Sequence, residues 1–146
     1  MVKYFLFLTA AVGLFSCNNS DEFELCNTSL HPYYYPELKY EGDFYAIKKH
    51  FKEYYQPVLA SDNSGIIRIR FQVNCKGESG NYNIETYDFN FKITQINKEI
   101  TTQLLELTKS LDGWIPARND DGKRVNSHKF LAFKVENGNL IEIMPK

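Results

Sequence analysis

Excess charge, long apolar runs and catalytic motifs are all scarce in this sequence of 146 residues. It has 17 basic and 18 acidic residues, so it lacks the basic face that nucleic-acid binding requires. Its apolar run from Tyr4 to Gly13 falls short of the roughly 20 residues that a membrane-spanning helix needs. No HExxH, no CxxC, no phosphate-binding Gly loop and no Gly-x-Ser-x-Gly elbow occurs. We therefore expect neither an enzyme nor a bound cofactor.

The histidines are too scattered to form a metal site. His31, His50 and His128 lie far apart, and none has a second ligand at metal-binding spacing. Asp120-Asp121 near His128 could be drawn as an acid–base pair, but these residues sit among turn formers, so a solvated turn is the simpler interpretation. The sequence predicts no metal ligand and no catalytic residue.

The N-terminus has the layout of a secretory signal. A short positive stretch, Met1-Val2-Lys3, precedes the apolar run, and small Ser16 stands directly before Cys17. That junction resembles the lipobox of bacterial lipoproteins, in which the Cys thiol receives a diacylglycerol. The resemblance implies a signal peptide over residues 1–16, lipidation of Cys17, and a membrane anchor in the cell envelope. We expect the outer membrane, with the domain on either its periplasmic face or the cell surface. The alternative is an ordinary secreted protein in which Cys17 is incidental.

Residues 17–35 are interpreted as a tether and an irregular lead-in. Asn18 to Glu22 is polar and acidic, which resembles the surface-export signals of lipoproteins in the Bacteroidota; a merely solvated leader is the alternative. Pro32 and Pro36 flank Tyr33-Tyr34-Tyr35 and discourage a helix there. This Tyr triplet is either a carbohydrate or protein contact surface or aromatic packing that covers one edge of the core.

Only 3 cysteines are present. If Cys17 is acylated, Cys26 and Cys75 remain as a pair in an oxidising compartment. A bridge would close a loop of about 50 residues and stabilise the fold by roughly 4 kcal/mol. Two buried free thiols are the alternative.

Two helices are predicted from apolar residues at helical spacing. The first has Asp43 as its N-cap and ends before Pro57, with a stripe of Phe44, Ile47, Phe51 and Tyr54. The second is capped by Asn97 and ends at Gly113 in the left-handed conformation, with a stripe of Ile100, Leu104, Leu107 and Leu111.

Alternating apolar residues predict four strands, over 67–73, 82–87, 130–135 and 140–143. Asn137-Gly138 is a tight-hairpin dipeptide between the last two. The order helix, strand, strand, helix, strand, strand predicts an α+β fold, a small two-layer sandwich with an antiparallel sheet and two helices on one face.

Several short pieces of this domain, taken in order, resemble the C-terminal domain of TonB, the energy transducer of outer-membrane transport. They are Pro36-Glu37 with Gly42-Asp43, the strand Gly65 to Asn74 with Lys76-Gly77, Trp114-Ile115-Pro116-Ala117, Gly122-Lys123-Arg124-Val125, and Phe133-Lys134-Val135. The resemblance implies a domain of this type over residues 36–146, with Trp114, Pro116 and Gly122 as its fold signature rather than as a site.

The resemblance also implies a binding function. In that family a strand near the C-terminus pairs with an extended peptide from a transporter, and Leu140, Ile141, Glu142 and Ile143 would form that strand here; an ordinary sheet edge is the alternative. TonB has a spanning helix and a long Pro-rich linker, and this chain has neither. From Cys17 to the first helix about 25 residues reach at most roughly 85 Å, so we expect partner binding without energy transduction.

A second class of function remains open. A surface module that binds glycans or inhibits an enzyme would use Tyr33 to Tyr35 and other exposed aromatic side chains.

Overall fold

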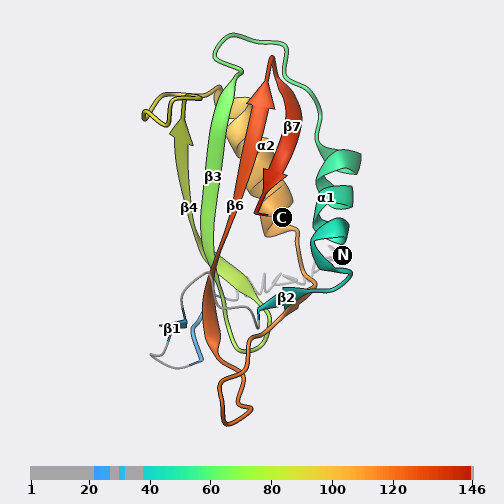
Figure 1. Ribbon diagram of the computed structural model, residues 1–146, viewed down its shortest axis with the longest axis vertical. Coiled ribbons are helices and arrows are strands. Elements are labelled where there is room, and N and C mark those ends of the chain that lie inside the picture. The colour runs from blue at the N-terminus through green and yellow to red at the C-terminus, as the bar shows by residue number, and fades with distance from the viewer. Residues whose placement is uncertain (1–21, 27–29, 32–37, 146) are drawn as a thin grey trace, which may run out of the picture.

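The computed structural model describes residues 22–26, 30–31 and 38–145. Its elements in chain order are β1 (Leu30–His31), β2 (Lys39–Tyr40), α1 (Asp43–Tyr54), β3 (Gly65–Val73), β4 (Ser79–Tyr87), α2 (Lys98–Lys109), β5 (Trp114–Ile115), β6 (Asn126–Glu136) and β7 (Asn139–Met144) (Figure 1). The predicted α+β class is confirmed. Cys17 and Tyr33 to Tyr35 lie outside the described residues.

The main sheet is built around β6. One side of β6 pairs with β3, which in turn pairs with β4. The other side pairs with β1 at Asn126 and Ser127 and with β7 from Ala132 to Glu136. Every pairing is antiparallel except that of β1 with β6, and β2 pairs with β5 in a separate two-stranded sheet. The pattern of apolar residues predicts neither the parallel pair nor the small second sheet.

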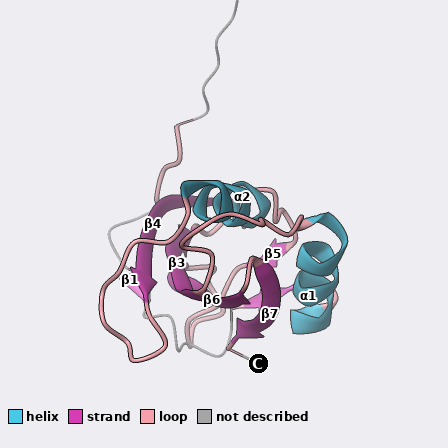
Figure 2. Ribbon diagram, turned by 90° about the horizontal axis from the view of Figure 1, so that it is seen from above, coloured by secondary structure: helices cyan, strands magenta, loops and turns pink. Residues whose placement is uncertain are grey.

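Both helices pack on one face of the main sheet (Figure 2). The alternating residues of β3 and β6 that were predicted to face the core are fully buried there; they are Ile67, Ile69, Phe71, Val73, Leu131, Phe133 and Val135. From α1, the ring of Phe51 lies 4.7 Å from that of Phe133. From α2, Ile100 and Leu104 are fully buried in the same core. Each such side chain contributes about 1.5–3 kcal/mol through burial.

The predicted start and inner face of α1 need correction. Gly42 occupies the N-cap with φ 75°, no side chain caps the helix, and Asp43 is already its first residue. Tyr54 was predicted in the apolar stripe but is 54% exposed, whereas Tyr55 is 8% exposed. The cause is the extended backbone of Tyr55 (ψ 130°), which ends the helix and turns that ring into the core.

The predicted end of α2 is also wrong. Asn97 caps the helix as expected, with its Oδ1 accepting from the Glu99 N–H at 2.9 Å. The helix ends at Lys109, however, and Ser110 is its C-cap. Gly113 lies further on, where its carbonyl accepts from the Glu41 N–H at 2.8 Å. The small sheet therefore determines the position of Gly113.

Candidate functional site

The predicted edge residues Leu140 to Ile143 all lie in β7. In the described part of the chain, β7 pairs with β6 on one side and with no strand on the other. The pairing of β7 with β6 shifts register between Lys134 and Val135, so Ile141 has no partner residue on β6. Ile141 is 53% exposed. Among the described residues, therefore, no strand occupies the outer side of β7, which is an edge of the sheet.

A groove of about 440 Å³ runs between β7 and α1. Phe51 and Tyr55, which are buried, form its apolar floor, and Pro57 also lines it. The Tyr55 hydroxyl donates to the Gly138 carbonyl at 2.9 Å, and the Val58 N–H donates to the same oxygen at 3.2 Å. Burial, and secondarily the charge of Glu99, raises the pKa of Tyr55 to about 12. The hydroxyl therefore remains a neutral donor that ties the end of α1 to the β6–β7 turn.

The rim of this groove is predominantly basic. Lys48 and Lys52 line it from α1, and Glu142 lines it from β7. Neither Lys forms an ion pair with any described residue. The helical spacing puts both lysines opposite the apolar stripe, but it does not show that α1 stands beside the sheet edge.

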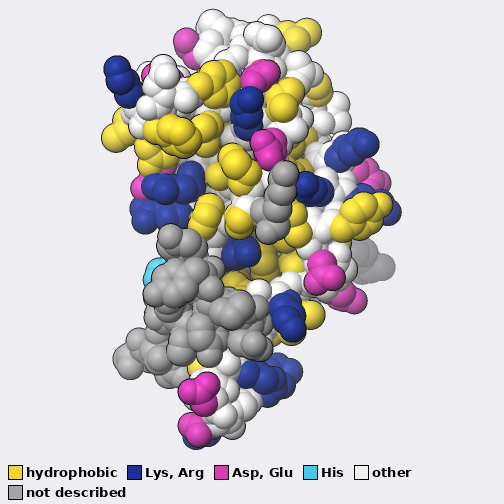
Figure 3. Space-filling view, in the orientation of Figure 1, with side chains coloured by type: hydrophobic (Ala, Val, Ile, Leu, Met, Phe, Trp, Pro, Cys, Tyr) yellow, Lys and Arg dark blue, Asp and Glu magenta, His cyan; other side chains and the backbone are white. Residues whose placement is uncertain are grey.

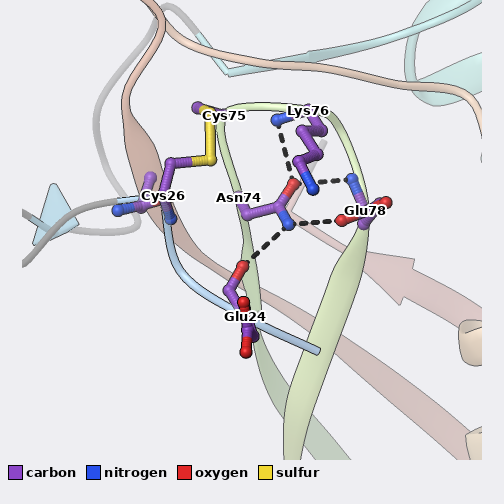
Figure 4. Close-up of a disulfide and its surroundings, with 7 residues drawn as sticks. Glu24, Cys26, Asn74, Cys75, Lys76 and Glu78 are labelled. Carbon is purple, nitrogen blue, oxygen red and sulfur yellow. Dashed lines mark hydrogen bonds between the residues drawn. A yellow bond between two sulfur atoms is a disulfide. The ribbon is translucent and has the colours of Figure 1, made fainter. Parts of the chain in front are cut away.

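A disulfide joins Cys26 to Cys75 with a Cα–Cα distance of 5.9 Å (Figure 4). The predicted bridge is thus present, and it fastens the N-terminal segment to the β3–β4 hairpin. The Cys26 N–H also donates to Oδ1 of Asn126 at 3.2 Å.

Asn74 organises this junction with every hydrogen bond its side chain can make (Figure 4). Its Oδ1 accepts from the N–H groups of Lys76 and Glu78 at 2.9 and 3.0 Å. Its Nδ2 donates to the Glu24 carbonyl at 2.9 Å and to Oε2 of Glu78 at 2.6 Å. The amide is fully buried, so it holds the hairpin and the N-terminal segment in one arrangement.

The three residues predicted to be a fold signature occupy structural positions. Trp114 is 6% exposed, with its ring 5.3 Å from that of Phe71 and 4.9 Å from that of Tyr40. The Trp114–Pro116 stretch passes so close to Gly77 that a side chain there would meet the Trp114 carbonyl. Gly122 lies in an exposed turn with φ 76°. Trp114 is therefore a core residue, as expected.

The candidate acid–base and metal residues stay apart. His50 Nε2 lies 3.1 Å from the Leu107 carbonyl and 3.0 Å from Oγ of Ser110, so it links the two helices. His128 is exposed on β6, and Asp120 and Asp121 are exposed in a loop. Within the described ranges, no three His, Cys, Asp or Glu side chains group as metal ligands. No helix in those ranges has the length and apolar character needed to cross a membrane.

No protein-family model, curated protein or solved structure matches this chain.

Proposed function

We propose that this chain is a lipid-anchored cell-envelope protein whose domain, of the TonB C-terminal type, captures an extended segment of a partner protein along β7. The observation that carries the proposal is the unpaired side of β7, which borders a groove whose other wall is α1. A strand added at such an edge gains affinity from backbone hydrogen bonds and specificity from alternate side chains. An outer-membrane transporter is the partner that the family resemblance favours.

The groove restricts which segment fits. In an added strand, every second side chain points to the same side, so one set would lie over Phe51 and Tyr55. Those positions should be apolar, because the floor is apolar. Lys48 and Lys52 favour acidic groups at the rim, where charge complementarity chiefly raises the association rate and the specificity. The preferred segment therefore alternates apolar residues with polar or acidic ones.

The anchor and the disulfide support binding close to one membrane. With Cys26 fixed to the hairpin, the tether from Cys17 has nine residue steps (26 − 17) and reaches at most about 30 Å. Disulfides persist in oxidising compartments, which agrees with an envelope location. So short a tether favours capture of a neighbouring protein over energy transduction.

In-cell photo-cross-linking from position 141 tests the proposal. A photoreactive phenylalanine analogue at Ile141 should capture an extended segment of an envelope protein, identified by mass spectrometry. Lys48→Glu with Lys52→Glu should reduce the yield about tenfold, because acidic side chains at the rim would be repelled. Lys49→Glu is the control: it reverses one charge on the exposed face of α1, outside the groove, and should leave the yield unchanged.

Two further changes separate this proposal from the aromatic-surface alternative. Ile141→Pro removes a backbone donor from β7 and should abolish capture. Capture that survives Ile141→Pro but fails when Tyr33, Tyr34 and Tyr35 are changed to Ala would reject β7 in favour of a glycan-binding or inhibitory surface.

A further inference from the structure

The face of the main sheet that the helices leave open contains a second hollow, of about 410 Å³. Figure 3 shows this face, with hydrophobic side chains gathered over its upper half and Lys and Arg side chains beside them. The floor of the hollow is formed by Ile66, Arg68, Ala132 and Met144, and its walls include Tyr87 and Phe91. Its volume lies within the range of small-molecule sites.

The strand register explains why the hollow exists. Arg68 on β3 is paired with Ala132 on β6, which is paired with Met144 on β7. The three side chains therefore form one row across the open face, because paired residues point to the same side of a sheet. The methyl group of Ala132 is much shorter than its two neighbours, so a depression remains between Arg68 and Met144.

The polar end of the hollow has a net positive charge. Glu85 is the single carboxylate between Arg68 and Arg70: its Oε2 accepts from Nε and Nη2 of Arg68, and its Oε1 accepts from Nη2 of Arg70 at 2.6 Å. Nη2 of Arg68 also donates to the Tyr87 hydroxyl at 2.9 Å. Nη1 of Arg68 donates to no described residue. Arg68 thus has one cationic donor without a partner among the described residues, beside the apolar side chains of Ile66, Ala132 and Met144.

The wall at Phe91 is held in place by its loop. The Asp88 carboxylate accepts from the N–H groups of Asn90 and Lys92 at 2.8 and 3.0 Å. The Phe91 N–H donates to the Asp88 carbonyl at 3.0 Å. This loop holds Phe91 at φ 60°, which is unusual for a bulky residue, and leaves its ring 74% exposed.

We propose that this hollow binds an amphiphilic carboxylate with a single aliphatic chain. The chain would lie over Ile66, Ala132 and Met144, and the carboxylate would accept from Nη1 of Arg68. Charge complementarity selects this occupant: the Arg68–Glu85–Arg70 group carries one net positive charge, and a charge-assisted hydrogen bond to a carboxylate is stronger than one to a neutral oxygen. The site is independent of partner capture at β7.

Methyl NMR titration of the purified mature chain carrying Cys17→Ser tests the proposal, with sodium decanoate as the probe and decan-1-ol as the uncharged control. We expect decanoate to shift the Ala132 and Met144 methyl signals and to bind about tenfold more tightly than decanol. Arg68→Gln should remove that tenfold preference. Arg70→Gln is the matched control, because it removes the same charge at a residue that shares Glu85 but does not line the hollow. It should keep the larger part of the preference, since the Arg68 donor stays in place.

Three results would overturn the proposal. Equal binding of decanoate and decanol would exclude carboxylate recognition. If Arg68→Gln and Arg70→Gln reduce the preference for decanoate equally, the preference would reflect the total charge of this face and not recognition by Arg68. Shifts at these methyl groups on adding phosphatidylcholine vesicles, with none on adding decanoate, would assign the face to a membrane surface instead.

Discussion

Single polar residues set the local arrangement at two places in the main sheet. Asn74 joins the hairpin to the N-terminal segment, and Glu85 holds two guanidinium groups on the open face. Neither role could be predicted from the sequence. The strand pattern places Arg68 and Arg70 on the polar face of β3, but it does not say which residue of β4 stands opposite them; only the register brings Glu85 to Arg68.

Glu85 should make the free energy of unfolding depend on pH in the acidic range. The hydrogen bond from Arg68 lowers the pKa of Glu85 below its ordinary value of 4.5, burial opposes this shift, and Tyr87 and the two Arg charges lower the pKa further. The pKa of Glu85 is thus lower in the folded state than in the unfolded state. The ionised carboxylate therefore stabilises the fold at pH values above the unfolded-state pKa. This stabilisation is lost as the pH falls through the folded-state pKa. Wild type should be more stable than Glu85→Gln at neutral pH, and the difference should shrink below about pH 4.5. Urea unfolding at a series of pH values measures the difference in free energy of unfolding between the two proteins. A difference that does not change with pH would contradict this account.

At the scale of elements, the β6–β7 turn supports the edge strand. Asn137 and Gly138 both have positive φ (48° and 76°), as the tight-hairpin dipeptide predicted. The Gly138 carbonyl receives the Tyr55 hydroxyl and the Val58 N–H. The turn thus positions β7 and the end of α1 together.

Gly138→Ala should destabilise the fold strongly. A Cβ there would overlap the Val58 carbonyl, and a positive φ is unfavourable for Ala, so we expect a loss of about 3 kcal/mol. Gly122→Ala is the matched control, since Gly122 has the same φ of 76° but nothing within 4 Å of the added methyl; it should cost about 1 kcal/mol. Chemical denaturation compares the two. Equal losses of stability in the two variants would mean that the contact between the added methyl and Val58 does not destabilise the fold.

Most elements were predictable from sequence, and their relative placement was not. The burial of Ile67, Phe71 and Phe133 follows directly from strand alternation. The boundary errors at Tyr54 and Gly113 have tertiary causes, because the core draws in Tyr55 and the β2–β5 pair fixes Gly113. The edge of the candidate site could be named as Leu140 to Ile143, whereas its opposite wall on α1 depends on how the helix packs.

For the whole molecule, the Cys26–Cys75 bridge constrains the unfolded chain. It spans 49 positions, and the chain-entropy model gives a stabilisation of roughly 4 kcal/mol for a loop of that size. Replacing both cysteines with Ser should lower the free energy of unfolding by that amount in urea titrations. A loss below about 1 kcal/mol would show that the unfolded chain is already constrained in another way.

Capture of a partner strand at β7 is the central claim, and amide hydrogen exchange tests it most directly. The probe is a synthetic peptide that spans the segment cross-linked to position 141. When it binds, exchange should slow at least about tenfold at those amides between Leu140 and Ile143 that point away from β6, because new backbone hydrogen bonds protect them. The amides of α2 should not change. Saturating binding that leaves β7 exchange unaltered would contradict strand addition at this edge.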